Sequence, residues 1–127
     1  MNPSTLTVTD IPESGVVSQP AGDTIDTDGV VPLAAGGATE RIVLEVENLD
    51  DAALTVRVKA GVHARAGIGD LSVALAASGD GATAKRVIAG LESARFAQKG
   101  GHMNIEFDAA SGAPNAKVRA YRLPRTL

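Results

Sequence analysis

The sequence contains no cysteine and no tryptophan, and its aromatic residues are limited to Phe96, Phe107 and Tyr121. Without cysteine, the chain can form neither a disulfide framework nor a thiolate metal site. Aromatic side chains bury the largest areas, so a core made of Val, Ile, Leu and Ala gains less from burial. A domain of 127 residues with such a core is a candidate for stabilisation by association, and we expect an oligomer.

Long apolar segments are also missing. The sequence has no run of 18 apolar residues, so it predicts no membrane-spanning helix. Residues 1–7 have neither the basic segment nor the apolar stretch of a secretory signal. We therefore expect no membrane partner, and the length of 127 residues predicts a single domain.

The sequence offers little that would support catalysis. His63 and His102 each lie in a loop flanked by glycine, and neither belongs to a recognisable Ser–His–Asp, Cys–His or HExxH arrangement. Residues 67–70 and 79–81 are rich in glycine but do not continue into a GxGxxG or GK[ST] phosphate-binding loop, so they are interpreted as turns. We expect no enzyme activity, no catalytic residues and no cofactor.

A metal site is considered only at the acidic segment Asp23–Asp28. Aligning Gly29 with the invariant glycine of an EF-hand loop places Thr24 and Ala35 where carboxylate ligands belong. An EF-hand is therefore rejected, and the segment is interpreted as an Asp-rich turn. Whether it binds calcium in a looser arrangement stays open.

The charge is unevenly distributed along the chain. Residues 1–54 carry a net charge of −9 and residues 55–127 a net charge of +6. Three explanations stay open: the two halves interleave and neutralise each other within one domain, form a nucleic-acid-binding face, or meet between neighbouring subunits. Because the chain is acidic overall and lacks aromatic platforms for bases, we expect no direct binding of nucleic acid.

Two regions of the sequence differ in composition. Residues 1–38 are rich in Pro, Gly, Asp, Ser and Thr, and their apolar residues come in short pieces. This composition predicts an extended N-terminal arm with one or two short strands, interrupted by Pro12, Pro20 and Pro32. Residues 39–127 are predicted to form the folded domain.

Strict alternation of apolar and polar residues marks residues 42–47 and 54–60 as half-buried strands. The turn residues between them predict a β-hairpin, in which the outward glutamates of the first strand face Arg57 and Lys59 of the second. Leu44 and Val56 are expected to be buried.

Further short strands are predicted around residues 71–75, 87–88, 95–97, 105–107 and 118–123, with Pro124 ending the last one. Many short strands separated by turns indicate an all-β fold. We expect a β-sandwich or barrel-like domain of short antiparallel strands with an extended N-terminal arm.

Several motifs together resemble the head decoration (capsid cement) proteins of tailed bacteriophages. They are residues 29–32, 42–48, 54–61, 69–73, 90–96 and 118–124. The resemblance implies a homotrimer that binds the major capsid protein on the outer surface of the virion and stabilises contacts between capsomers. Two alternatives stay open: another virion component, such as a tail-tube or head–tail joining protein, and a non-viral β-sandwich binding module.

The arm supplies most of the expected subunit interface. Leu6, Val8, Val16 and Val17 lie in a context too interrupted to form a core of their own, so we expect them to pack on another subunit. Arg65 and Arg95 from the basic half complete the predicted interface residues. On this hypothesis, removing residues 2–20 leaves the domain folded but weakens assembly.

Overall fold

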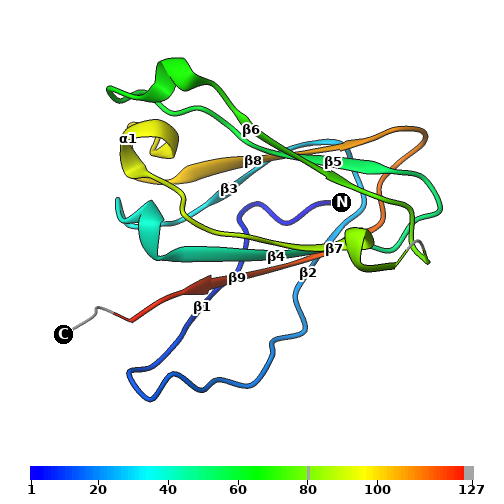
Figure 1. Cartoon of the computed structure of the whole chain (residues 1–127), viewed down its shortest axis with the longest axis horizontal. Coiled ribbons are helices and arrows are strands. Elements are labelled where there is room, and N and C mark those ends of the chain that lie inside the picture. Colours follow the sequence, from blue (N-terminus) through cyan, green and yellow to red (C-terminus); the bar gives the residue numbers. More distant parts are fainter. Residues whose placement is uncertain (80, 125–127) are drawn as a thin grey trace.

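The computed structural model describes residues 1–79 and 81–124. Across these residues the chain consists mainly of short strands, and α1 (Ser93–Phe96) is a single helical turn (Figure 1). The strands are β1 (Val8–Asp10), β2 (Asp23–Ile25), β3 (Gly29–Leu33), β4 (Ile42–Asn48), β5 (Leu54–Val58), β6 (Leu71–Leu75), β7 (Lys85–Ile88), β8 (Met103–Ala109) and β9 (Ala116–Arg122). Short 3-10 turns occupy Thr39–Arg41, Ala66–Ile68 and Gly81–Ala84. The predicted all-β class is confirmed, and no helix in this part of the chain has the length and apolar character needed to cross a bilayer.

The strands form two sheets. The five-stranded sheet has the order β1-β9-β4-β7, and β2 also pairs with β9; the four-stranded sheet has the order β3-β8-β5-β6. β1 runs parallel to β9, and the other strand pairs are antiparallel. β9 is thus the strand on which β1, β2 and β4 all assemble.

Buried residues of both sheets belong to one hydrophobic core. Leu44 of β4 and Val56 of β5 are fully buried, as their alternation with polar neighbours predicted. Phe96 and Phe107 are both in this core, so most of the small aromatic content serves packing. The inward positions of β9, among them Val118 and Ala120, are buried as well.

The predicted hairpin is wrong. β4 pairs with β7 and β9 in the five-stranded sheet, whereas β5 pairs with β6 and β8 in the four-stranded sheet. The connection between β4 and β5 therefore passes from one sheet to the other. Asn48 fixes this passage, because its buried side-chain amide donates hydrogen bonds to the carbonyls of Ala52 and Ala76 at 2.8 and 2.9 Å.

The predicted strand around residues 95–97 is also wrong, since this segment contains part of α1. The turn is held from outside by Glu40, whose carboxylate accepts hydrogen bonds from the Ser93 N–H at 2.7 Å and the Ser93 hydroxyl at 2.8 Å. These bonds, led by the one from the backbone N–H, lower the pKa of Glu40. Phe96 is thereby directed into the core.

Parts of the predicted N-terminal arm belong to the sheets. β1 and β2 pair with β9, and β3 pairs with β8. Leu6 forms a parallel bridge with Leu33, donates its N–H to the carbonyl of Pro32 at 2.9 Å and is buried. Removing residues 2–20 would therefore remove Leu6 from the core together with β1, which contradicts the expectation that this region is dispensable for folding.

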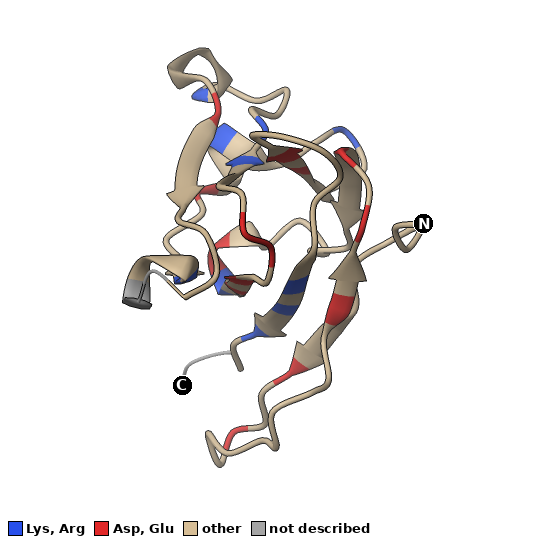
Figure 2. Ribbon diagram, turned by 90° about the vertical axis from the view of Figure 1, so that its right-hand side faces the viewer, with Lys and Arg blue, Asp and Glu red and all other residues tan. Residues whose placement is uncertain are grey.

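Acidic and basic halves of the sequence meet within the five-stranded sheet. Glu45 lies 3.3 Å from Arg119 and Glu47 lies 3.6 Å from Lys85. Both glutamates are on β4, and their partners are on the neighbouring strands β9 and β7. The interleaving explanation for the uneven charge therefore accounts for these groups, and Figure 2 shows the basic residues of the strand that leads to the C-terminus beside a strand that carries acidic residues.

Candidate interaction surface

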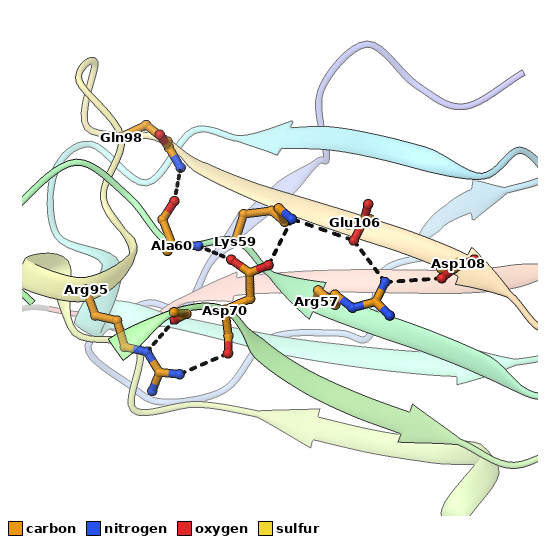
Figure 3. A network of polar contacts seen from close by, with 9 residues as sticks. Arg57, Lys59, Ala60, Asp70, Arg95, Gln98, Glu106 and Asp108 are labelled. Atoms are coloured by element: carbon orange, nitrogen blue, oxygen red, sulfur yellow. Dashed lines mark hydrogen bonds and ion pairs between the residues drawn. The ribbon is translucent and has the colours of Figure 1, made fainter. Parts of the chain in front are cut away.

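The outward face of the four-stranded sheet carries a row of ion pairs. Arg57 of β5 donates to Glu106 at 3.0 Å and to Asp108 at 3.2 Å, both on β8 (Figure 3). Lys59, just after β5, lies 2.8 Å from Asp70 and 3.8 Å from Glu106. These charges are paired with one another across neighbouring strands, so the face has little unpaired charge to offer a partner.

Asp70 joins this row to the backbone. Its carboxylate also accepts a hydrogen bond from the N–H of Ala60 at 2.6 Å. The pair with Lys59 and this backbone bond lower the pKa of Asp70 and the same pair raises the pKa of Lys59. The glycine-rich segment before β6 is thereby tied to the end of β5.

The two arginines predicted at a subunit interface lie at this end of the molecule. Arg95 donates to the carbonyls of Gly69 and Asp70 at 3.0 and 3.1 Å, and its guanidinium lies 4.6 Å from the centre of the Phe96 ring. Arg65 forms a 3.2 Å pair with Glu92, and both side chains are about half exposed. Arg95 is thus engaged within its own chain, whereas Arg65 is accessible.

The outward face of the five-stranded sheet is different, because residues 11–22 cross it as a strap between β1 and β2. Residues 12–19 of this strap are all exposed, and Figure 1 shows it extending well away from the two sheets. Its return half is held by polar contacts: Gln19 donates to Glu45 at 3.0 Å, and Arg119 donates to the carbonyl of Pro20 at 2.7 Å. The same projection is seen in the perpendicular view of Figure 2.

Two shallow hollows flank this part of the strap. One, of about 250 Å³, lies between the strap and β7 and is bordered by Glu45, Glu47, Lys85, Val87 and Arg119. The other, of about 230 Å³, lies on the side of β1 and β2. The strap therefore rests on the sheet without filling the surface beneath it.

The outer edges of the sheets are not equally covered. At β6, Arg86 donates to the carbonyl of Ala74 at 3.3 Å, and Arg95 occupies the carbonyls just before the strand. At β3, the carbonyl of Pro32 accepts bonds from residues 5 and 6. β7 pairs with β4 on one side, and no strand of the described chain pairs with its other side. Val87 on this strand is 66% exposed.

The apolar residues predicted at the interface separate into two groups. Leu6 is buried in its own chain and Val8 packs against the core, so neither presents a full side chain to a partner. Val16 and Val17 lie in the strap, and Val16 is 76% exposed. The accessible apolar groups of this region are therefore the two valines of the strap.

The three aspartates of the predicted turn interact with different groups of the chain. Asp23 accepts hydrogen bonds from the N–H and hydroxyl of Thr7, Asp26 pairs with the N-terminal ammonium, and Asp28 accepts the N–H of Ala109. Nowhere in residues 1–79 and 81–124 do three His, Asp or Glu side chains gather as a metal-binding group.

No protein-family model, curated protein or solved structure matches this chain.

Sequence reasoning found the strap valines but missed the open edge of β7. The signal for the strap was present, because Pro12 and Pro20 bracket a segment with two adjacent exposed valines. The edge had no comparable signal, since the pattern of a four-residue strand does not reveal which of its sides has a neighbour.

Proposed function

We propose that this chain is a structural virion protein that binds the outer surface of an assembled tailed-phage capsid and stabilises contacts between capsomers. It acts as a homotrimer, in contact with copies of itself and with the major capsid protein. The resemblance of its strand motifs to head decoration proteins motivates the assignment. We also infer that its two sheets form a β-sandwich from which the strap extends as an arm.

The observation that carries this proposal is the contrast between the paired surface and the strap. The four-stranded face has its charges paired, whereas the strap presents Val16, which is 76% exposed, and Val17, which is 37% exposed. A segment that gains little from its own chain gains more by burying its apolar groups against another protein. Many copies that each bind only the assembled lattice would stabilise it in proportion to their occupancy.

The test is binding to capsids. The purified protein should cosediment with mature, expanded heads built from the major capsid protein of the same virus, and less with unexpanded shells. Heads carrying it should resist heat or chelation better than bare heads. Equal absence from both kinds of shell, with recovery in purified tails, would replace this proposal with the tail-component alternative.

A further inference from the structure

We propose that the strap is an arm held closed by a latch, the ion pair between Glu45 and Arg119, and that breaking this latch lets the strap swing away from the five-stranded sheet as a unit. In the released state residues 11–22 stay tethered to β1 and β2 at their two ends, and both sheets stay folded. This motion belongs to the chain by itself and does not depend on capsid binding.

The strap is attached to the rest of the chain at few points. Within the described residues, 12–22 make two polar contacts outside the strap, one from the side chain of Gln19 and one at the carbonyl of Pro20. The hydrogen bond from the Gly15 N–H to the carbonyl of Pro12, at 2.8 Å, lies within the strap itself. Residues 12–19 are all exposed, so little apolar burial holds them. A segment with so few contacts can open while the sheets stay folded.

Both contacts converge on the latch. Glu45 of β4 lies opposite Arg119 of β9, and their charged groups are 3.3 Å apart. The carboxylate of Glu45 accepts a hydrogen bond from the side-chain amide of Gln19 at 3.0 Å. The guanidinium of Arg119 donates to the carbonyl of Pro20 at 2.7 Å, and only 16% of this side chain is exposed. Loss of either charged group therefore breaks one strap contact directly and leaves the group that makes the other contact without its partner.

A glycine lets the strap lie close to the latch. Gly22 has a φ of +87°, and a β-carbon at this position would lie 3.0 Å from Cγ of Arg119 and 3.2 Å from the carbonyl oxygen of Val118. A larger residue would be strained at this φ and would press the strap away from the arginine. Gly15 has a φ of +77°, but a β-carbon built there meets no atom of the described chain within 4 Å. The two glycines thus offer a matched pair of substitutions.

The surface beneath the strap leaves room for this movement. Arg119 borders both shallow hollows, with Gln19 beside the one toward β7 and Pro20 and Gly22 beside the other. Because the hollows are not filled by side chains, the return half of the strap can lift without displacing residues of the core. Lifting it joins the two hollows into one groove over β9 and β4.

Spin labels on two engineered cysteines measure the position of the strap, and the chain has no cysteine of its own to interfere. Ser18→Cys places one label on the exposed return half of the strap, and Ser72→Cys places the other on the exposed side of β6. Pulsed electron paramagnetic resonance then gives the distribution of distances between them. The labelled full-length chain is diluted with unlabelled protein, so that only labels within one copy are measured. With the latch intact, we expect one narrow distance.

Gln19→Ala and Arg119→Met, introduced singly and together into the labelled chain, should release the strap. Half of the strap, about six residues, can span up to about 20 Å when extended, so the distance distribution should become at least about twofold broader. Lys117→Met is the matched control, because Lys117 lies on the same face of β9 but contacts Thr24 of β2. This control should leave the distribution narrow.

Gly22→Ala should broaden the distribution without removing a latch group, whereas Gly15→Ala should leave it close to that of the unchanged strap. Circular dichroism of each variant checks that the sheets remain folded. If Arg119→Met does not fold, Gln19→Ala and Gly22→Ala decide the question, since neither removes a side chain of the core. An unchanged distribution in the latch variants, equal broadening by Lys117→Met, or a broad distribution with the latch intact would each overturn the proposal.

Discussion

The two sheets bury the same kinds of side chain inside but present different surfaces outside. On the four-stranded sheet, Arg57, Lys59 and their carboxylate partners form a continuous set of pairs over β5, β8 and the segment before β6. On the five-stranded sheet, a strap crosses β9 and leaves hollows on both sides of its path, and no described strand pairs with the outer side of β7. One face has its charges paired within the chain, and the other carries an exposed strap with shallow hollows beside it.

This difference shows how a small domain with few aromatic residues divides its surface. Paired charges and covered edges at β6 and β3 reduce unwanted strand pairing there, since exposed edges are templates for association. In residues 1–79 and 81–124, no strand pairs with the outer side of β7.

Both sheets contribute residues to one hydrophobic core, so a change in that core should have the largest effect on stability. Replacing Leu44, fully buried on β4, by alanine should cost about 2–5 kcal/mol of unfolding free energy. Val43, its half-buried neighbour on the outward side of the same strand, should cost about 1 kcal/mol or less when changed to alanine. Chemical denaturation measures both, and equal costs would mean that the inward and outward faces have been confused.

The N-terminal residues should divide into a structural part and an exposed part. Leu6→Ala should destabilise the fold by at least about 2 kcal/mol, because Leu6 is buried between the edges of the two sheets. Val16→Ala in the strap should change stability by less than about 0.5 kcal/mol, because its side chain is exposed. Thermal unfolding of the two variants, at a concentration where the protein is monomeric, decides whether this boundary is placed correctly.

The paired face should be sensitive to the loss of one charge. Asp70→Asn keeps an oxygen that can accept the Ala60 N–H but removes the attraction for Lys59, so a loss of about 0.5–1 kcal/mol is expected. Glu92→Gln breaks the more exposed pair with Arg65 and should cost less than about 0.5 kcal/mol. If both variants unfold at the same denaturant concentration, the row of pairs adds nothing beyond an ordinary surface ion pair.

Lowering the pH should gradually reduce the stability that the ion pair of Asp70 contributes. The pKa of Asp70 is lowered in the folded protein, so its contribution is fully present above the ordinary carboxyl pKa of about 4 and is lost as the pH falls through the lowered value. The pKa of Glu40 is lowered too, and this contribution remains in an Asp70→Asn variant. Unfolding midpoints measured from pH 7 down to about pH 2 should therefore fall less steeply for that variant.

The sequence predicted local features well because these features depend on short patterns of neighbouring residues. Alternation identified β4 and β5 and placed Leu44 and Val56 inside, and Pro124 marked the end of β9 within two residues. Each of these inferences depends on neighbours along the chain. The exposure of Val16 and Val17 follows in the same way from the Pro- and Gly-rich sequence around them.

Partner choice was harder to predict because it depends on distant residues. The alternation of β4 and β5 defines their buried faces, but it does not show which strands pair with them. β4 pairs with β7 and β9, and β5 pairs with β8, whereas β4 and β5 do not pair with each other. Arg95 and Phe96 were expected in a strand because the bond from Ser93 to Glu40, across 53 positions, has no local signature. The place of Leu6 in the core depends equally on a distant partner, Leu33.

The position of β9 has a consequence for how the protein is made. Residues 116–122 hold β1, β2 and β4 together, although those strands are synthesised long before them. A nascent chain that has not yet reached Ala116 can pair the four-stranded sheet but leaves the early strands of the other sheet with open edges. Until the last strand arrives, these edges are exposed to other chains, so ribosome stalling or premature termination before this point should yield aggregating fragments.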